Sequence, residues 1–426
     1  MDDEEDYGAA PGGERALTEV AWETASVATQ LAAILDTIEH HRGTEKPMSP
    51  SRVAHISAMI DDLAVTLTAA ALGIRRRRRM LSARWYEEVC RVGEGGFGTV
   101  VRAPHRSTGQ HVAVKTPRRS GPGGHEVIMD LLREACFLAA CRAHPSLLVG
   151  FRGMVRRVDT SSRGEEEYSI VMDYIDGSSL AHILHERGQP FPEEEVRRIM
   201  RQLLRGASAM HENGIVHRDI NPSNIFVDGD DEGIIKIGDY GCAKSTAEAR
   251  PPFCVAGTNG YMAPEVLVED AAGHGTAADM WSLGCVMAEL LTDTLMFDGD
   301  EDAEQLCRIF DVLGVPEDEE ALRPRVLEDL VRQQRVLQRL VGHRQDLLRR
   351  MVPEEMLSLD GFEVLRGLLA CDPRKRLTAH EALRLPWFTE HAVTTKSWSA
   401  VLLQMAGRVL GWLRATTVPW GACLCH

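Results

Sequence analysis

The sequence has few lysines, no Cys-x-x-Cys pair and no long apolar run, and each absence argues against a class of protein. The ten cysteines include no Cys-x-x-Cys pair and no metal-ligand spacing, which excludes a zinc module and favours free thiols in a reducing compartment. No apolar run approaches the roughly 18 residues of a membrane-spanning helix, so no transmembrane segment is predicted. The acidic start MDDEEDYG lacks the features of a signal or transit peptide.

Acidic residues outnumber basic ones, 63 to 48. The formal net charge is −15, which argues against nucleic acid as the main partner, because binding its backbone requires a basic face. Nearly all basic residues are arginines, and the lysines lie only at positions 46, 115, 236, 244, 375 and 396. Lys115 therefore stands out from its background. With 426 residues, 44% of them hydrophobic and 26% charged, the chain can form two or three globular domains.

The two ends of the chain differ from its centre. Residues 1–14 are acidic and rich in glycine, so we expect a disordered tail. Residues 15–84 carry two helical apolar patterns, which predict a helical hairpin, followed by five arginines. The arginines are either a nuclear-import or acidic-surface patch or a solvated linker. Residues 389–426 predict a tail with an amphipathic helix that docks on the body of the protein, or on a membrane or protein surface.

These end regions bear on partners and location. Residues 15–74 and the C-terminal helix are the candidate contacts for a regulatory partner. Since the sequence shows neither a leader nor a membrane span, we expect a cytoplasmic and/or nuclear location.

The stretch from His217–Arg218–Asp219 to Asn224 carries most of the predicted chemistry. Asp219 is suited to orient a hydroxyl or to accept its proton. Asn224 and Asp239, the first residue of Asp239–Tyr240–Gly241, supply the amide and carboxylate oxygens that Mg²⁺ prefers. His217 is more readily explained as a packed structural histidine than as a general base.

A glycine-rich run and one lysine complete this set. Glycines at positions 93, 95 and 98 allow backbone N–H groups to approach phosphate oxygens. The same pattern occurs in dinucleotide-binding folds between a strand and a helix, whereas strand-like residues flank this run on both sides and favour a β-hairpin. The predicted cofactor-binding residues of this run are Val92, Gly93, Glu94, Gly95, Gly96, Phe97, Gly98, Thr99 and Val100. Lys115 ends the next strand and could reach phosphates if Glu134 held it.

With these motifs in place, residues 86–388 resemble a eukaryotic protein kinase. The resemblance rests on the glycine-rich loop at 93–100, Val112–Ala113–Val114–Lys115, His217–Arg218–Asp219, Asp239–Tyr240–Gly241 and Ala263–Pro264–Glu265, in that order. It implies an α+β, two-lobed fold with a small β-rich lobe and a large, mainly helical lobe.

The resemblance also implies functional roles. ATP and Mg²⁺ would be bound, with Asp219 as catalytic base, Asn224 and Asp239 as metal ligands, and Lys115 and Glu134 as the phosphate-anchoring pair. Met172 would be the gatekeeper, and the adenine-contacting hinge would include Asp173 and Ile175. Pro222–Ser223–Asn224 and Thr258 indicate serine or threonine, rather than tyrosine, in protein substrates.

Within this family the chain is similar to cyclin-dependent kinases, and most of all to the F-type, cyclin-dependent-kinase-like group of plants. Residues 279–316 and 383–388 carry this likeness. It implies an ion pair between Glu265 and Arg376, and a carboxylate at Asp279 that braces the catalytic loop. Residues 257–262 lack the arginine used for proline-directed substrates. The helix around Glu134 does not read as a cyclin-docking helix, which argues against dependence on a cyclin.

Two residues depart from the family pattern. Asn221 occupies the position of a lysine that contacts the transferred phosphate, and losing such a contact would cost about 3–4 kcal/mol, or about 10²–10³ in rate. Phe253 stands where a regulatory threonine is expected, with Ser245 and Thr246 as alternative sites. Two functions stay open: an ATP- and Mg²⁺-dependent serine/threonine kinase, which the retained motifs favour, and an ATP-binding pseudokinase or scaffold.

Overall fold

The computed structural model covers most of the central part of the chain. The described residues are 80–82, 86, 90–95, 98–106, 108–118, 124–158, 166–229, 233–246, 257–267, 275–299, 301–314 and 347–389. The predicted tail 1–14, the helical hairpin, the arginine run and the C-terminal helix lie outside them, as do Gly96, Phe97 and Phe253. Among the helices of the described ranges, none combines the length and the apolarity needed to cross a bilayer.

The described residues divide into two compact units. The first contains the described residues up to Ala140 together with Phe151–Met172, and the second contains Cys141–Gly150 and the described residues from Asp173 onward. A β-sheet dominates the first unit and helices dominate the second. The prediction of an α+β fold with a β-rich and a mainly helical lobe is confirmed.

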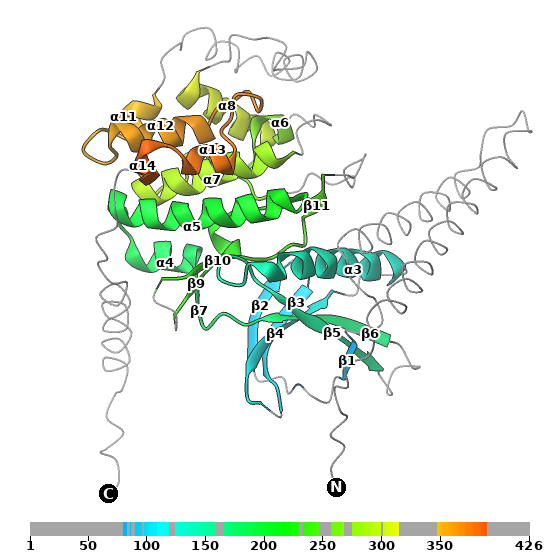
Figure 1. Cartoon of the computed structure of the whole chain (residues 1–426). Coiled ribbons are helices and arrows are strands. Elements are labelled where there is room, and N and C mark those ends of the chain that lie inside the picture. The colour runs from blue at the N-terminus through cyan, green and yellow to red at the C-terminus, as the bar shows by residue number, and fades with distance from the viewer. Residues whose placement is uncertain are drawn as a thin grey trace, which may run out of the picture. The chain divides into compact units, whose positions relative to one another are not determined.

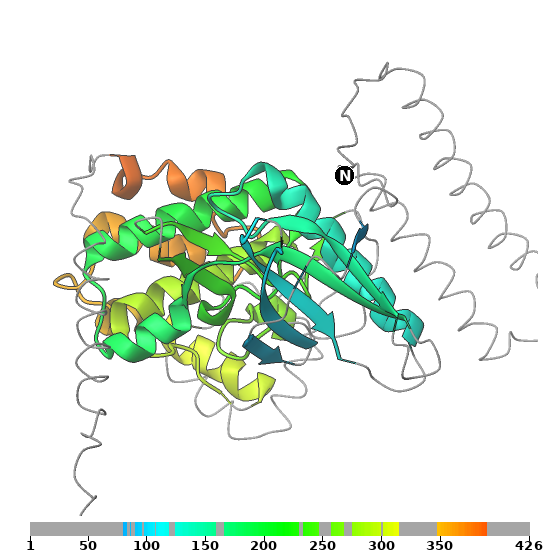
Figure 2. The same cartoon turned by 90° about the horizontal axis from the view of Figure 1, so that it is seen from below.

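The first unit holds a sheet with one long helix against it (Figure 1). Its strands are β1 (Met80–Ser82), β2 (Cys90–Gly95), β3 (Gly98–Pro104), β4 (His111–Pro117), β5 (Phe151–Val158) and β6 (Glu166–Asp173), in the spatial order β1-β5-β6-β4-β3-β2. Helix α3 (Gly124–Ala140) packs on β5 and lies beside the strands when the molecule is turned (Figure 2). Because β2 and β3 pair antiparallel, the glycine-rich run lies in a β-hairpin, as predicted.

Strand β4 is buried on both faces. Val112, Ala113, Val114 and Lys115 are all buried in succession, which is the pattern of a strand covered on two sides. Val112 and Val114 pack into an apolar cluster with residues of neighbouring strands. Side chains alternate along a strand, so Lys115 points away from the face that carries this cluster. A buried ammonium group needs a partner, and Glu134 of α3 supplies it.

Strand β1 was not predicted. Met80–Ser82 falls in the region 15–84, for which we expect a helical hairpin and a linker, yet it pairs parallel to β5 with Met80 opposite Met154. An edge strand presents unpaired backbone groups, and an added strand pairs with them. Three residues are too few to show a hydrophobic period, so the sequence gives no signal for this strand.

The second unit combines helices with two small sheets. The helices are α4 (Leu180–Arg187), α5 (Glu193–Glu212), α6 (Pro264–Leu267), α7 (Thr276–Thr292), α8 (Asp302–Leu313), α11 (Leu348–Met351), α12 (Leu359–Leu368), α13 (Ala379–Leu383) and α14 (Pro386–Thr389), with 3₁₀ turns η2 (Cys141–Ala143) and η3 (Pro222–Asn224). The strands β7 (Gly177–Ser179), β9 (Ile225–Asp228) and β10 (Ile235–Ile237) form one sheet, and β8 (Ile215–Val216) pairs with β11 (Lys244–Ser245). The predicted hairpin around residues 225–237 is confirmed.

Helix α7 lies at the centre of the second unit. Its side chains are buried around almost the whole helix, including the fully buried Trp281, as expected for a helix that is apolar on all sides. Helix α5 packs along it (Figure 1). Arg376 donates from Nη1 and Nη2 to the two carboxylate oxygens of Glu265, at 2.6 and 2.9 Å, which confirms the predicted ion pair.

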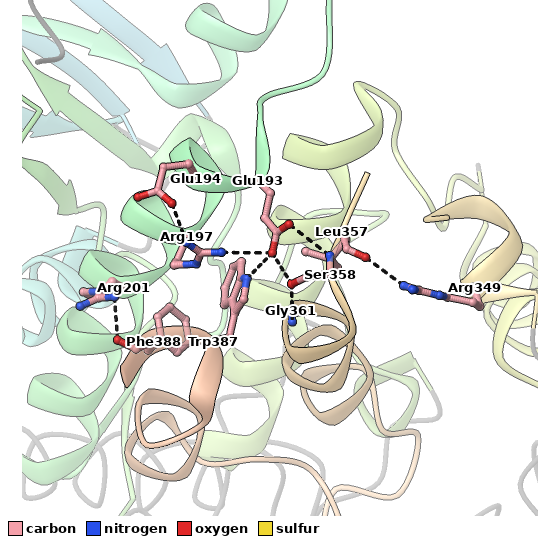
Figure 3. A network of polar contacts seen from close by, with 10 residues as sticks. All are labelled: Glu193, Glu194, Arg197, Arg201, Arg349, Leu357, Ser358, Gly361, Trp387 and Phe388. Atoms are coloured by element: carbon pink, nitrogen blue, oxygen red, sulfur yellow. Dashed lines mark hydrogen bonds and ion pairs between the residues drawn. The ribbon is translucent and has the colours of Figure 1, made fainter. Parts of the chain in front are cut away.

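A polar network connects the C-terminal part of the second unit with helix α5 (Figure 3). Glu193, in the first turn of α5, accepts hydrogen bonds from Trp387 Nε1 at 2.6 Å and from the backbone N and Oγ of Ser358 at 3.1 and 2.5 Å. Arg197 Nη2 lies 3.2 Å from the same carboxylate. Because Ser358 caps α12 and Trp387 belongs to α14, one carboxylate joins three helices.

Replacing Glu193 with alanine is expected to lower the free energy of unfolding by about 2 kcal/mol, because Trp387 Nε1 and both Ser358 donors lose their acceptor. Glu194 is the matched control. Its side chain is 47% exposed and pairs with Arg197, so Glu194→Ala should cost less than about 1 kcal/mol. Urea denaturation of the two variants provides the comparison, and equal midpoints would contradict the assigned role of Glu193.

The stabilisation provided by Glu193 is expected to depend on pH. Burial raises the pKa of Glu193, but hydrogen bonds from Ser358 and Trp387 outweigh it and hold the pKa below its ordinary value of 4.5. The folded state therefore favours the carboxylate. Its contribution should be fully present above pH 4.5 and should disappear as the pH falls through the lowered pKa. The stability gap between the wild type and Glu193→Ala should narrow over that range.

Candidate active site

The loop that follows β8 is held by a buried carboxylate of α7. Asp279 is fully buried and accepts hydrogen bonds from the backbone N of His217 at 2.9 Å and of Arg218 at 2.8 Å. Arg218 has φ = 67°, an uncommon conformation for a residue with a side chain, and these bonds stabilise it. Its Nε donates to the carbonyl oxygen of Cys242 at 2.6 Å. The predicted bracing role of Asp279 is confirmed.

Asp279 stays ionised in this setting. Burial raises its pKa, but the hydrogen bond and charge of His211 and the backbone N–H of His217 outweigh the effect and hold the pKa below its ordinary value. His217 is itself fully buried, and its Nε2 donates to the carbonyl oxygen of Gly238 at 3.0 Å. It packs as a structural residue, as predicted.

The carboxylate of Asp219 is oriented by three uncharged donors. Its Oδ1 accepts from Thr258 Oγ1 at 2.7 Å and from Asn221 Nδ2 at 3.0 Å. Its Oδ2 accepts from Asn224 Nδ2 at 2.9 Å. Each carboxylate oxygen can accept two hydrogen bonds. Oδ2 therefore retains acceptor capacity for the proton of an incoming hydroxyl.

Asn224 and Asp239 provide a donor set for a divalent cation. The amide N–H₂ of Asn224 binds Asp219, which leaves the carbonyl oxygen Oδ1 as the atom that a metal would contact. Gly238 N donates to the backbone oxygen of Asn224 at 2.9 Å, so the residue before Asp239 adjoins Asn224. Asp239 itself has φ = 60°. One amide and one carboxylate oxygen fit Mg²⁺, which keeps its other positions for water and phosphate oxygens.

A different kind of metal centre finds no support. Within the described residues, no group of three or more histidine, cysteine, aspartate or glutamate side chains is arranged to hold a metal ion.

The glycine-rich hairpin belongs to the first unit. Gly93 pairs with Val100, Glu94 with Thr99 and Gly95 with Gly98 across β2 and β3. Gly98 has φ = 142°, and a Cβ atom there would lie 2.2 Å from the carbonyl oxygen of Thr116. Only glycine fits at this position. The exposed side chain of Val92 precedes this part of the hairpin.

The predicted pair of Lys115 and Glu134 is present in the first unit. Lys115 Nζ lies 2.8 Å from Glu134 Oε1, and both residues are buried. The carboxylate fixes the ammonium group of Lys115. The strand was expected to end on Lys115, but β4 continues for two more residues to Pro117, which pairs with Gly98.

The predicted hinge residues lie at the end of β6 and just beyond it. Asp173 N donates to the carbonyl oxygen of Gly150 at 2.9 Å, and Asp173 Oδ2 accepts from Gly150 N at 3.0 Å. These reciprocal bonds fix the backbone at the end of the strand. Ile175 follows and is partly exposed, and Met172 before them is buried.

The structure thus divides the predicted site residues into two groups. Asp219, Asn224 and Asp239 lie on adjoining loops of the second unit, and Lys115 and Glu134 lie side by side in the first.

Sequence reasoning missed two contacts of this site. Thr258 served only as a marker of serine/threonine specificity, yet its hydroxyl donates to Asp219. Its place five residues before Ala263 in a Gly-Thr turn was the available signal. The side chain of Asn221, interpreted as a missing charge, is hydrogen-bonded to Asp219, Thr258 and Ser223.

Comparison with known proteins agrees with this arrangement. A family model described as a protein kinase domain matches residues 86–388. A putative cyclin-dependent kinase F-2 of Oryza sativa subsp. japonica is 42% identical over 312 residues, which cover 72% of this chain and 90% of that protein. Cyclin-dependent kinase G1 of Arabidopsis thaliana is 32% identical over 319 residues, covering 72% of this chain and 50% of that protein. Cyclin-dependent kinase 4 of Ovis aries is 32% identical over 307 residues, covering 70% and 94%.

Proposed function

The chain belongs to the protein kinase family, as a serine/threonine kinase of the cyclin-dependent-kinase-like group, and from this premise we propose that it transfers the γ-phosphoryl group of ATP to serine or threonine hydroxyls of proteins with the help of Mg²⁺. The observation that carries the proposal is the setting of Asp219. Its carboxylate is fixed by three donors and still has acceptor capacity on Oδ2.

Each predicted residue has a defined task in this reaction. Asp219 orients the substrate hydroxyl and receives its proton as the new oxygen–phosphorus bond forms and the bond to ADP breaks. Asn224 Oδ1 and the carboxylate of Asp239 would hold Mg²⁺, which supplies charge neutralisation when bound. Lys115, fixed by Glu134, would contact phosphate oxygens.

The non-catalytic alternative suggested by Asn221 receives no support. The relatives described above are all named as kinases. The side chains expected to orient the hydroxyl and to hold the metal are retained in the second unit.

For binding partners we propose less than for the reaction. Protein substrates follow from the family. The relatives are named as cyclin-dependent kinases, which makes a cyclin the first regulatory partner to test, against our expectation from the helix around Glu134. A cytoplasmic and/or nuclear location stays a proposal drawn from the sequence.

Transfer of radiolabelled phosphate from ATP to the chain itself and to a generic protein substrate tests the function. Transfer should require Mg²⁺, should stop when EDTA removes the metal, and should fall about 10²-fold in Lys115→Met. Lys236→Met is the matched control, because Lys236 also pairs with a carboxylate, that of Asp228 at 3.5 Å, but lies outside the site. If the wild type transfers no more phosphate than Lys115→Met, the proposed function is wrong.

A further inference from the structure

Both polar atoms of the Asn221 side chain are hydrogen-bonded, within the loop 217–224 and to Thr258. The residue is 4% exposed. Its Nδ2 lies 3.0 Å from Asp219 Oδ1, 3.2 Å from the backbone oxygen of Asp219 and 3.0 Å from Thr258 Oγ1. Its Oδ1 accepts from the backbone N of Ser223 at 2.9 Å. An amide has two N–H donors and one carbonyl oxygen, so this environment engages both ends of the side chain.

These contacts connect Asp219 with the turn that follows Asn221 in the same loop. Through Nδ2, Asn221 holds the carboxylate of Asp219 both directly and by way of Thr258. Through Oδ1, it is the N-cap of η3, the single turn that ends at Asn224. One side chain therefore fixes the residue expected to receive the proton and the turn that presents an expected metal ligand.

A direct contact between Asn221 and a phosphate would disrupt this arrangement. The amide N–H groups face Asp219 and Thr258, and one of these bonds would have to break for Nδ2 to donate elsewhere. The residue is also almost completely buried. Its effect on the reaction should therefore come from the geometry of its neighbours.

We infer that Asn221 is a positioning residue that couples Asp219, Thr258 and Asn224. The absence of a lysine at this position does not make the catalytic loop inactive. The inference rests on the proposed kinase activity. On this interpretation Asn221 is not simply a lost charge. Its uncharged amide orients the Asp219 carboxylate, once directly and once by way of Thr258, at a position where the family uses a lysine.

Steady-state kinetics of variants at Asn221 and Thr258 test this inference. Asn221→Ala should lower kcat by about 10- to 100-fold, because misplacement of a reacting group has effects of this size. The KM for ATP should change by less than about twofold, since Asn221 does not bind the nucleotide. Asn221→Asp keeps the cap for Ser223 but places a second carboxylate beside Asp219, so its kcat should fall below that of Asn221→Ala.

The remaining variants separate the coupling to Thr258 from the effect of charge. Thr258→Val combined with Asn221→Ala should cost less than the sum of the single changes, because both residues act on Asp219 Oδ1. Asn221→Lys restores the family's charge but cannot accept from Ser223 N, and it should raise kcat by less than about tenfold. If the missing cation limits the rate, the gain would instead be about 10²-fold or more. Asn213→Ala is the matched control, because its exposed amide donates to the carbonyl oxygen of Ala209, outside the site.

The outcomes are distinguishable. A fall in kcat with constant KM for ATP, sub-additive with Thr258→Val, supports the positioning role. An unchanged kcat in Asn221→Ala, a raised KM with unchanged kcat, or a large gain in Asn221→Lys overturns it while the kinase activity stands. A wild-type chain without Mg²⁺-dependent transfer overturns the proposed function, and this inference with it.

Hydrogen exchange adds a reading that does not depend on activity. The Ser223 amide bonds to Asn221 Oδ1 and should exchange faster in Asn221→Ala than in the wild type or in Asn221→Asp. Equal exchange in all three proteins would overturn the capping part of the inference.

Discussion

Phosphoryl transfer by Asp219→Asn is expected to be about 10³-fold slower than transfer by the wild type, within the 10²–10⁴ that a positioned acid or base contributes. An asparagine cannot receive the proton of the attacking hydroxyl. It also cannot satisfy all of the present donors, because its N–H₂ group would face either Asn224 Nδ2 or the pair formed by Thr258 Oγ1 and Asn221 Nδ2. The measurement is single-turnover transfer to a generic protein substrate with excess enzyme and Mg²⁺.

Nucleotide binding should be nearly unaffected by the same change. Since Asp219 acts on the hydroxyl, the KM for ATP should change by less than about threefold. Asp228→Asn is the control: it removes the same charge from the second unit at a residue that pairs with Lys236. Asp219→Asn that keeps more than about a tenth of wild-type transfer, far above the residual expected for loss of a catalytic base, would exclude Asp219 from that role.

The parts of the fold that sequence reasoning predicted are those with a local signal. The hairpin of β9 and β10 follows from two apolar runs around a polar turn, and the glycine-rich hairpin follows from strand-like residues on both sides of its glycines. The ion pair between Glu265 and Arg376 joins residues 111 positions apart, and it was predicted only through resemblance to a family. No period or spacing within the chain points to it.

The contacts that escaped prediction depend on tertiary packing. Glu193 and Trp387 are separated by 194 positions, and no sequence pattern near either residue predicts their contact. Asn221 shows the limit most clearly. The sequence reveals which residue is missing there, but only the packed loop reveals that its amide is engaged at both ends. A substitution read as a loss of charge is, in the structure, an exchange of one set of bonds for another.

Loss of the buried ion pair between Arg376 and Glu265 is expected to have the largest effect on stability. The Arg376 side chain is 0% exposed and that of Glu265 is 7% exposed. Besides binding both carboxylate oxygens, the guanidinium donates from Nη1 to the carbonyl oxygen of Ala277 at 2.7 Å and from Nε to that of Ala370 at 2.9 Å. It therefore connects α6 with the start of α7 and with Ala370, two residues after the end of α12.

Arg376→Met should lower the free energy of unfolding by about 3–5 kcal/mol, because it leaves the Glu265 carboxylate buried without its partner. Methionine fills a similar length of apolar space, so the loss reports mainly on the charge. Urea denaturation followed by far-UV circular dichroism measures it. The double variant Glu265→Leu with Arg376→Met removes both charges, and it should be more stable than Arg376→Met because no unpaired carboxylate is left.

Arg374→Met provides a comparison with a pair whose arginine is exposed. Arg374 also holds an aspartate through its guanidinium, with Nε 3.0 Å from Asp372 Oδ1, but the arginine side chain is 67% exposed. The Asp372 side chain is 9% exposed, and it keeps the backbone N–H of residue 374 as a donor after the change. Water reaches the guanidinium of this pair and the carboxylate keeps a backbone donor, so loss of the guanidinium should cost no more than about 1 kcal/mol. The two variants delete the same group from two paired arginines that are near neighbours in the chain. Equal losses would mean that burial does not decide the strength of the Glu265–Arg376 pair, whereas a difference of about 2 kcal/mol or more assigns the excess to the unpaired Glu265 carboxylate.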